Sequence, residues 1–266
     1  MQYIKDLLIN SKIYHGDCLE KMKLIDNKSV DLILCDLPYG TTKCKWNIII
    51  PFEPLWEQYN RILKDNGSIV LNASQPFTSL LITSNIKMFK YSWVWEKNCP
   101  SNIACGNSQP LRYTEDICVF YKNKSTFNKQ MIERSESGSK LIKQYQKNNI
   151  SFKLSKSDVS SNTATEVDPN KYDSMLKNPS NLIYFGVERG KAHVHPTQKP
   201  LALFEYLIKT YTNEGDLVLD NCAGSGTTGV ACLKLNRRFI LIEKENEFVD
   251  IIKNRIKEEI LFIKEE

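Results

Sequence analysis

The sequence lacks any long apolar run. Its 266 residues contain no stretch of eighteen consecutive apolar residues, so a membrane-spanning helix, which needs about 20 of them, is not expected. The opening residues also lack the apolar core and the small-residue cleavage site of a secretory signal peptide. These absences favour a cytoplasmic protein that has no membrane partner.

Metal-binding patterns are missing as well. The chain has eight cysteines, but no two are spaced as Cys-x-x-Cys, the pairing that is typical of structural zinc sites. Cys35 and Cys118 lie inside apolar runs, where a reduced cysteine behaves as a small buried hydrophobic residue. We therefore expect reduced thiols in the core and no metal site.

Positive charge clearly exceeds negative charge in only one segment of the chain. Between Lys122 and Lys191 there are thirteen Lys and Arg against seven Asp and Glu, a net charge of +6, whereas the whole chain carries +5. A basic segment on a nearly neutral body favours a polyanionic partner. A lysine-rich solvated surface would give the same count, so charge alone leaves both interpretations open.

Strand and helix patterns alternate at both ends of the chain. Val30–Cys35 is a short apolar run typical of a strand buried on both faces, and Glu53–Leu63 has helical spacing followed by a predicted stop at Asn66-Gly67. The other predicted strands are Ser68–Ala73, Tyr91–Trp95, Ile117–Tyr121, Asp216–Asp220 and Phe239–Glu243. The other predicted helices are Phe77–Ile86, one that starts at Pro200, Thr227–Leu235 and a final one through Phe248 and Ile260. This alternation predicts a doubly wound α/β sheet assembled from two halves that are distant in sequence.

The composition changes in the middle of the chain. From Asn123 to Asn181, Lys, Ser, Asn and Gln dominate and the apolar periodicity is weak. Such a segment is either a partly ordered insertion or a separate recognition module.

One turn near the C-terminus is suited to bind a nucleoside. An apolar strand ends at Asp220, and a turn of small residues, Asn221–Gly226, leads into a helix; such a turn lets a ligand approach the backbone at the carboxyl end of a strand. The G-x-G-x-x-G spacing of dinucleotide sites and the lysine of a P-loop are both missing. Glu243 ends the next strand, where its carboxylate could accept hydrogen bonds from both hydroxyls of a ribose. A nucleoside site without a phosphate clamp favours S-adenosylmethionine, although an ordinary strand–turn–helix connection would have the same pattern.

A second signal, Asp36-Leu37-Pro38-Tyr39-Gly40, follows an apolar strand directly. The lone pair of an exocyclic amine is delocalised into its base, and acceptors aimed at its N–H groups make the nitrogen more nucleophilic. The carboxylate of Asp36 and the backbone carbonyl of Leu37 could be such acceptors, and Tyr39 offers a face on which a flipped base can stack. Taken alone, the tetrapeptide could equally be a tight turn.

Together, the two signals resemble the DNA amino-methyltransferases. Asp36-Leu37-Pro38-Tyr39 is similar to their D-P-P-Y catalytic motif, and Ala223-Gly224-Ser225-Gly226-Thr227-Thr228 is similar to their F-x-G-S-G-T-T cofactor motif. His195-Pro196-Thr197-Gln198-Lys199-Pro200 matches the H-P-T-Q-K-P element of the beta class. The catalytic motif precedes the cofactor motif, which is the order of that class. The resemblance spans about residues 13–121 and 190–260.

The resemblance implies a Rossmann-like methyltransferase fold with a circularly permuted motif order. It divides the chain into a catalytic half at 1–122, a target-recognition insertion at 123–190 and a cofactor-binding half at 191–266. It also implies the roles of individual residues. Those expected to be catalytic are Asp36, Leu37, Pro38 and Tyr39; those expected to bind the cofactor are Asp17, Cys18, Asp36, Lys199, Asp220, Cys222, Ala223, Gly224, Ser225, Gly226, Thr227 and Glu243; those expected to bind the substrate are Tyr39, Trp46 and His195.

Several of these matches have a plainer alternative. Asp17 resembles the acid that meets the cofactor's adenine, but it could be an exposed turn residue. Trp95-Glu96-Lys97-Asn98 and Tyr113-Thr114-Glu115 resemble the family's W-x-K and h-E elements at the edge of the pocket, and Trp46 resembles the tryptophan that often follows the catalytic motif. Both tryptophans could instead be core residues. Asn47 stands where the family often has an acid after the tryptophan.

Two departures from the motifs do not touch the reacting atoms. Leu37 replaces the first proline of the catalytic motif, which loses some rigidity but keeps the backbone carbonyl. Cys222 replaces the phenylalanine of the cofactor motif and removes an aromatic wall. The sequence therefore predicts an enzyme that transfers a methyl group from S-adenosylmethionine to the N6 amine of adenine in double-stranded DNA.

The resemblance leaves other functions open. A cytosine-N4 methyltransferase shares the fold but usually begins its tetrapeptide with Ser, and an RNA methyltransferase or an inactive DNA-binding relative would share parts of the pattern. A cytosine-C5 methyltransferase is excluded because no Pro-Cys nucleophile is present. Beyond double-stranded DNA, a homodimer and a restriction endonuclease are partners that the resemblance leaves open.

Overall fold

The computed structural model describes residues 9–41, 47–148, 152–153, 166–171, 173–187 and 198–265. It contains two compact units, one formed by residues 1–128 with 181–266 and the other by residues 129–180. The smaller unit is shorter than the predicted insertion at 123–190, because both flanks of that segment are bonded to the larger unit. The backbone N–H of Asn128 donates to the carbonyl of Thr210 at 2.7 Å, and Ile183 pairs with Trp95 in a strand.

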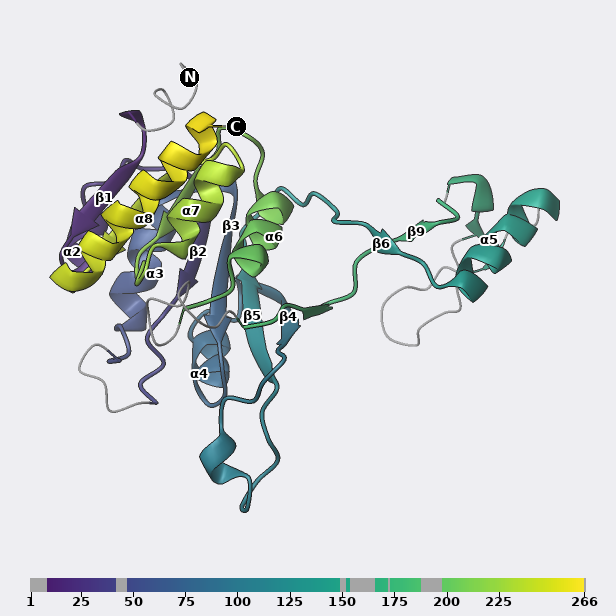
Figure 1. The fold of residues 1–266 in the computed structure, drawn as a ribbon, viewed down its shortest axis with the longest axis horizontal. Coiled ribbons are helices and arrows are strands. Elements are labelled where there is room, and N and C mark those ends of the chain that lie inside the picture. Colours follow the sequence, from purple (N-terminus) through teal and green to yellow (C-terminus); the bar gives the residue numbers. More distant parts are fainter. Residues whose placement is uncertain are drawn as a thin grey trace. The chain divides into compact units, whose positions relative to one another are not determined.

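An eight-stranded sheet forms the centre of the larger unit (Figure 1). Its order is β1-β12-β11-β2-β3-β5-β4-β10, and all neighbours are parallel except that β5 runs antiparallel to β3 and β4. In this order the strands are Lys12–His15, Arg238–Glu243, Leu217–Asp220, Val30–Asp36, Leu63–Ala73, Thr114–Phe120, Phe89–Glu96 and Leu182–Tyr184. The predicted α/β sheet, assembled from two halves that are distant in sequence, is thereby confirmed.

The two halves of the sequence meet where β11 pairs with β2. Val218 lies opposite Leu32 and Leu219 opposite Ile33 in a parallel register. Both strands end in an aspartate, so this pairing brings Asp36 and Asp220 to the same carboxyl edge of the sheet. In parallel sheets of this kind, ligands bind outside the carboxyl ends of the strands.

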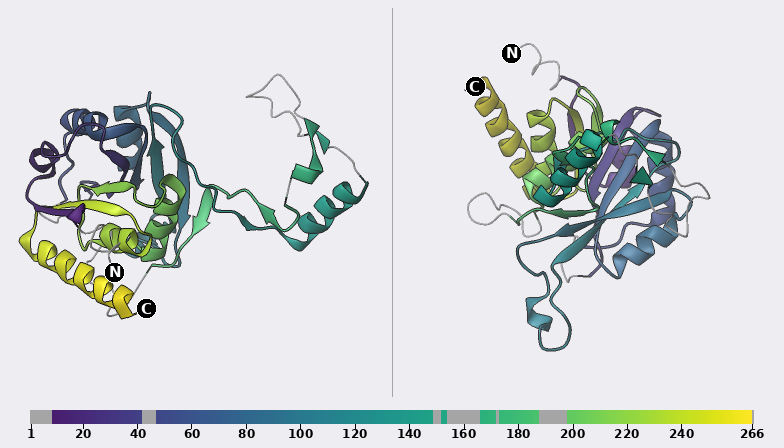
Figure 2. Two further views of the ribbon diagram at one scale, coloured as in Figure 1. Left: turned by 90° about the horizontal axis from the view of Figure 1, so that it is seen from above. Right: turned by 90° about the vertical axis from the view of Figure 1, so that its right-hand side faces the viewer.

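Helices cover both faces of the sheet (Figure 2). Because side chains alternate along a strand, Leu32 and Leu34 of β2 join one buried cluster and Ile33 and Cys35 join the other. The first cluster contains residues of α6 (Leu201–Tyr211), α7 (Thr227–Lys234) and α8 (Asn246–Glu265), and the second contains residues of α2 (Cys18–Met22), α3 (Phe52–Ile62) and α4 (Phe77–Ser84). None of the helices in the described part of the chain is long and apolar enough to cross a membrane.

The predicted helix stop at Asn66-Gly67 is wrong. The helix ends at Ile62, and Leu63 already has extended backbone angles and pairs with Val30 as the first residue of β3. A Cβ on Gly67 would lie 2.9 Å from the carbonyl oxygen of Asp31 and 2.7 Å from the side chain of Leu63. Gly67 is therefore required for close packing against the neighbouring strand, which a sequence pattern cannot distinguish from a helix end.

The smaller unit contains α5 (Glu136–Asn148), the short strand pairs β6–β9 and β7–β8, and the 3-10 turn η2 (Pro169–Lys171). These strands are Ile132–Glu133 with Leu176–Lys177 and Phe152–Lys153 with Glu166–Val167. Arg134 closes the first pair, because its guanidinium donates to the carbonyl of Leu176 at 2.7 Å and its backbone N–H to that of Met175 at 2.7 Å. Of the side chains described in α5, Ser139 and Ile142 are buried.

Candidate active site

The turn after β11 is organised by the carboxylate of Asp220. One oxygen accepts a short hydrogen bond from the hydroxyl of Thr228, and the other accepts the backbone N–H of Cys222 at 3.1 Å. Gly224 and Gly226 have positive φ angles of 51° and 79°, which glycine adopts without strain. Burial raises the pKa of Asp220 to about 6, although the hydrogen bonds from Thr228 and Cys222 act in the opposite direction.

The neighbouring strand β12 ends with a second buried carboxylate, Glu243. Its Oε2 accepts the backbone N–H of Gly224 at 2.7 Å, and its Oε1 accepts those of Lys244 at 2.7 Å and Glu245 at 2.9 Å. Burial raises the pKa of Glu243, whereas these three amides lower it. Asp17 lies between β1 and α2 in the sequence and caps α2: its Oδ1 accepts a hydrogen bond from the backbone N–H of Leu19 at 2.9 Å.

The third carboxylate at this edge, Asp36, has two partners. The hydroxyl of Tyr39 donates to Oδ1 at 2.6 Å, and the ammonium of Lys199 lies 2.8 Å from Oδ2. The ring of Tyr39 is stacked on Phe77 with 5.1 Å between the centroids and 24° between the planes. The pKa of Tyr39 is raised by burial and by the charge of Asp36, so its hydroxyl stays protonated and acts as a donor.

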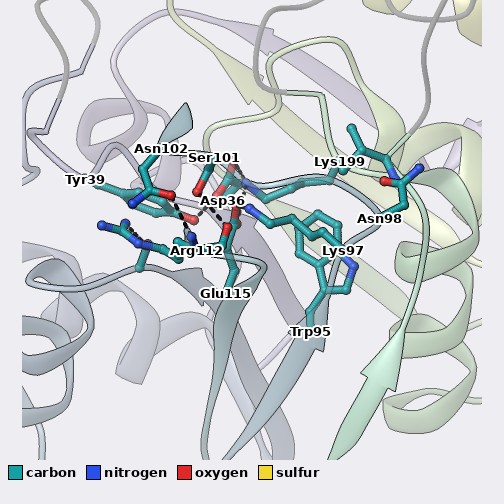
Figure 3. Close-up of polar contacts among 12 residues, drawn as sticks. Asp36, Tyr39, Trp95, Lys97, Asn98, Ser101, Asn102, Arg112, Glu115 and Lys199 are labelled. Carbon is teal, nitrogen blue, oxygen red and sulfur yellow. Dashed lines mark hydrogen bonds and ion pairs between the residues drawn. The ribbon is translucent and has the colours of Figure 1, made fainter. Parts of the chain in front are cut away.

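Lys199 also joins Asp36 to a second pair of charges (Figure 3). Its Nζ lies 3.3 Å from Oε2 of Glu115, and Oε1 of Glu115 is 2.8 Å from Nζ of Lys97. We call Asp36, Lys199, Glu115 and Lys97 the charge chain. The indole of Trp95 faces both ammonium groups, with 6.0 Å from its ring centroid to Lys199 and 5.7 Å to Lys97.

The charge chain keeps Lys199 and Glu115 ionised despite their burial. Burial alone would lower the pKa of Lys199, but the carboxylates of Asp36 and Glu115 outweigh it and raise that pKa. Burial would likewise raise the pKa of Glu115, but Lys199 and Lys97 reverse this and lower it. Each charge is therefore stabilised by its neighbours, as buried ions require.

One cavity of about 880 Å³ connects these groups. Of the predicted site residues, only Gly226 is absent from its wall among those that the structure describes; Trp46 and His195 lie outside the described residues. The predicted residues that line it are Asp17, Cys18, Asp36, Leu37, Pro38, Tyr39, Lys199, Asp220, Cys222, Ala223, Gly224, Ser225, Thr227 and Glu243. The structure thus brings residues separated by about two hundred positions into one site.

Sequence reasoning missed several residues of this wall. Phe248, at the start of α8, lines the cavity and provides an aromatic side chain that Cys222 cannot. Arg112 and Asn102 line it from the connection between β4 and β5, and no motif identifies them. Gln198 could have been found through the H-P-T-Q-K-P element: it is buried, and its Oε1 accepts a hydrogen bond from Ser225 at 3.3 Å.

Comparison with known proteins identifies the family. Residues 30–254 match the model of the N6/N4 DNA methylases. The chain belongs to this family of DNA methylases. The predicted family and enzyme class are thereby confirmed.

Individual DNA methylases are similar over most of their length. The type II methyltransferase M2.MboI of Moraxella bovis is 30% identical, with 94% of this chain and 88% of that protein aligned. The DNA adenine methyltransferase YhdJ of Escherichia coli K12 is 31% identical over 89% of this chain and 79% of its own length. The crystal structure of the M1.HpyAVI–SAM complex is 27% identical, with a TM-score of 0.58 over 92% of this chain and 98% of that one. The cytosine-N4-specific PvuII methyltransferase, at 18% identity and a TM-score of 0.63 over 92% of this chain and 86% of that one, shares the fold.

The raised pKa of Asp220 predicts a pH dependence of the DNA methylase's stability. Its pKa is about 6 in the fold against an ordinary value of 3.8, so the native state binds this proton more tightly and stability falls as pH rises from about 4 to 6. Asp220→Asn removes this contribution. The free energy of unfolding of the variant relative to wild type should therefore rise by up to about 3 kcal/mol between pH 4 and pH 7. Urea denaturation at both pH values measures it, and a difference that does not change with pH would contradict this role.

Proposed function

We propose that this DNA methylase transfers a methyl group from S-adenosylmethionine to the N6 amine of adenine in double-stranded DNA. The observation that carries the proposal is the position of Asp36 and Tyr39 in the same cavity as the turn Asn221–Gly226 and the carboxylate of Glu243. An amine-orienting group and a nucleoside-binding turn thus face one space. A single ligand-sized cavity lets the two substrates react directly.

The residues of the cavity fit S-adenosylmethionine, the methyl donor of this family. The positive φ of Gly224 leaves its backbone free of a side chain beside the cavity, and the carboxylate of Glu243 is suited to the hydroxyls of a ribose. A volume of about 880 Å³ is at the upper end of ordinary small-molecule sites, which suits a donor together with a flipped base. When bound, the donor supplies an electrophilic methyl group on a positively charged sulfur.

In the reaction, the protein positions the base and stabilises the charge that develops on its amine. The stacked rings of Tyr39 and Phe77 offer a rigid aromatic surface for the base. The carboxylate of Asp36 accepts a hydrogen bond from the amine, replacing the one that it accepts from Tyr39. As the amine attacks, positive charge develops on its nitrogen, and the negative charge of Asp36 stabilises it. The ion pair with Lys199 fixes the direction of that carboxylate.

Adenine is proposed over cytosine because Asp36, and not Ser, heads the catalytic tetrapeptide. The physical margin is small, because both bases present an amine beside a ring nitrogen and both can stack on Tyr39. Stacking discriminates between bases by only about 1–3 kcal/mol. Cytosine-N4 methylation is therefore the alternative that the experiment below must separate.

DNA is the substrate of this family, and we propose that the DNA is double-stranded. We propose the compact unit at 129–180 as the target-recognition region, because α5 places Lys140 and Lys143 on its surface. A homodimer, a restriction endonuclease partner and a cytoplasmic location remain predictions.

The methylated nucleoside tests the proposal directly. Unmethylated plasmid DNA incubated with the protein and S-adenosylmethionine, then digested to nucleosides, should contain N6-methyladenine by mass spectrometry. Asp36→Ala should reduce its formation by about 100-fold or more, because the amine loses its acceptor and its charge stabilisation. N4-methylcytosine in place of N6-methyladenine would contradict the choice of base, and near-normal turnover of Asp36→Ala would contradict the role of the carboxylate.

The compact unit predicts a salt dependence of DNA binding. Each lysine that neutralises a phosphate contributes nearly one unit to the slope of log affinity against log salt. Replacing Lys140, Lys143 and Lys147 of α5 with Ala should therefore flatten this slope by about two to three units without changing the affinity for S-adenosylmethionine. Binding to a fluorescent duplex at several salt concentrations measures it. A slope equal to that of wild type would place the phosphate contacts elsewhere.

A further inference from the structure

The connection between β4 and β5 is a hairpin, residues 97–113, that extends beyond the end of the sheet (Figure 1, Figure 2). Hydrogen bonds between its two arms give it a defined shape. The N–H of Ser101 donates to the carbonyl of Arg112 at 3.0 Å, the side-chain oxygen of Asn102 accepts the N–H of Arg112 at 2.6 Å, and its amide donates to the carbonyl of Pro110 at 3.0 Å. The hairpin is therefore preorganised.

The base of this hairpin forms part of the active-site wall. Ser101, Asn102 and Arg112 line the cavity, and Figure 3 shows them beside Tyr39 and Asp36. The guanidinium of Arg112 donates to the hydroxyl of Ser74 at 2.7 Å, which ties the hairpin to the end of β3. A base held against Tyr39 would therefore lie next to the hairpin.

The outer part of the hairpin carries an exposed aliphatic side chain, just before the turn that reverses the chain. Ile103, in the 3-10 turn η1 (Ile103–Cys105), is 70% exposed, more than Leu111 at 42% or Tyr113 at 43%. No Asp or Glu occurs between Asn98 and Tyr113, so the hairpin carries no charge that a polyanion would repel. An arm that has no acidic residue and carries an exposed apolar side chain suits contact with stacked bases better than contact with water.

We propose that this hairpin enters the DNA beside the flipped base and that Ile103 fills the space the base leaves. The proposal rests on the proposed function, because a base must leave the stack to reach Asp36. Extrusion costs a few kcal/mol of unstacking and unpairing, and an apolar side chain in the gap restores part of the lost contact. Ile103 thus acts on base extrusion and leaves the methyl-transfer chemistry unchanged.

The test compares two variants of the same residue type. Ile103→Ala removes most of the exposed apolar side chain. Ile86→Ala is the matched control, because Ile86 is 62% exposed and precedes β4 at the end opposite to the hairpin. Both are assayed in the full chain with two synthetic duplexes that contain the recognition sequence read from methylated plasmid DNA. In one duplex the target base is paired, and in the other it lies opposite an abasic site, where less energy is needed to extrude it.

We expect Ile103→Ala to lower kcat/KM at least tenfold on the paired duplex and to come within threefold of wild type on the abasic duplex, with unchanged affinity for S-adenosylmethionine. Ile86→Ala should match wild type on both. The proposal is overturned if Ile103→Ala equals Ile86→Ala on the paired duplex, or if the loss is equal on both duplexes. A wild-type protein that methylates neither duplex would instead contradict the proposed function, and the hairpin's role with it.

Discussion

The ion pair between Asp36 and Lys199, at 2.8 Å, is the interaction on which the site depends. Asp36 ends β2 in the N-terminal half, and Lys199 precedes α6 in the C-terminal half. The pair joins the two halves at the carboxyl edge of the sheet, where β2 and β11 already lie side by side. Without it, the carboxylate that we propose as the acceptor for the substrate amine would lose the contact that fixes its direction.

A buried pair of this kind needs further partners, because desolvation of two ions can cost more than their attraction returns. Glu115 accepts the second contact of Lys199, and Lys97 balances Glu115. The hydroxyl of Tyr39 donates a hydrogen bond to the other oxygen of Asp36. The charge chain and its contact with Tyr39 therefore bring two lysines, two acids and a tyrosine from four separate segments into one small volume.

Much of the fold was predictable, because the apolar runs that end in Asp36, Asp220 and Glu243 mark buried parallel strands. The sequence did not predict β10, since only Ile183 of its three residues is buried and it lies in the polar segment. The helix end near Gly67 was wrong because close packing and helix termination favour the same residue.

The site was predictable to the extent that motifs mark its residues. Asp36, Tyr39 and the glycine turn stand in short consecutive motifs, so the sequence alone identified them as candidate site residues. The bonds of Glu115 to Lys97 and Lys199 depend on the register of β4 and β5, which no local pattern gives. Arg112 and Asn102 belong to a hairpin without a motif, so only the structure relates them to the cavity.

The most direct test of this account is the effect of Lys199→Gln on turnover and on cofactor affinity, measured together. If Lys199 holds Asp36 and does not bind the cofactor, contrary to the role that the family resemblance implied, kcat for DNA methylation should fall about 100-fold or more. The Kd for S-adenosylmethionine by calorimetry should then change less than about threefold. Lys244→Gln, at an exposed lysine that lines the same cavity, should leave kcat unchanged. A variant of Lys199 that kept its turnover, or that lost only cofactor affinity, would contradict the central role of the ion pair.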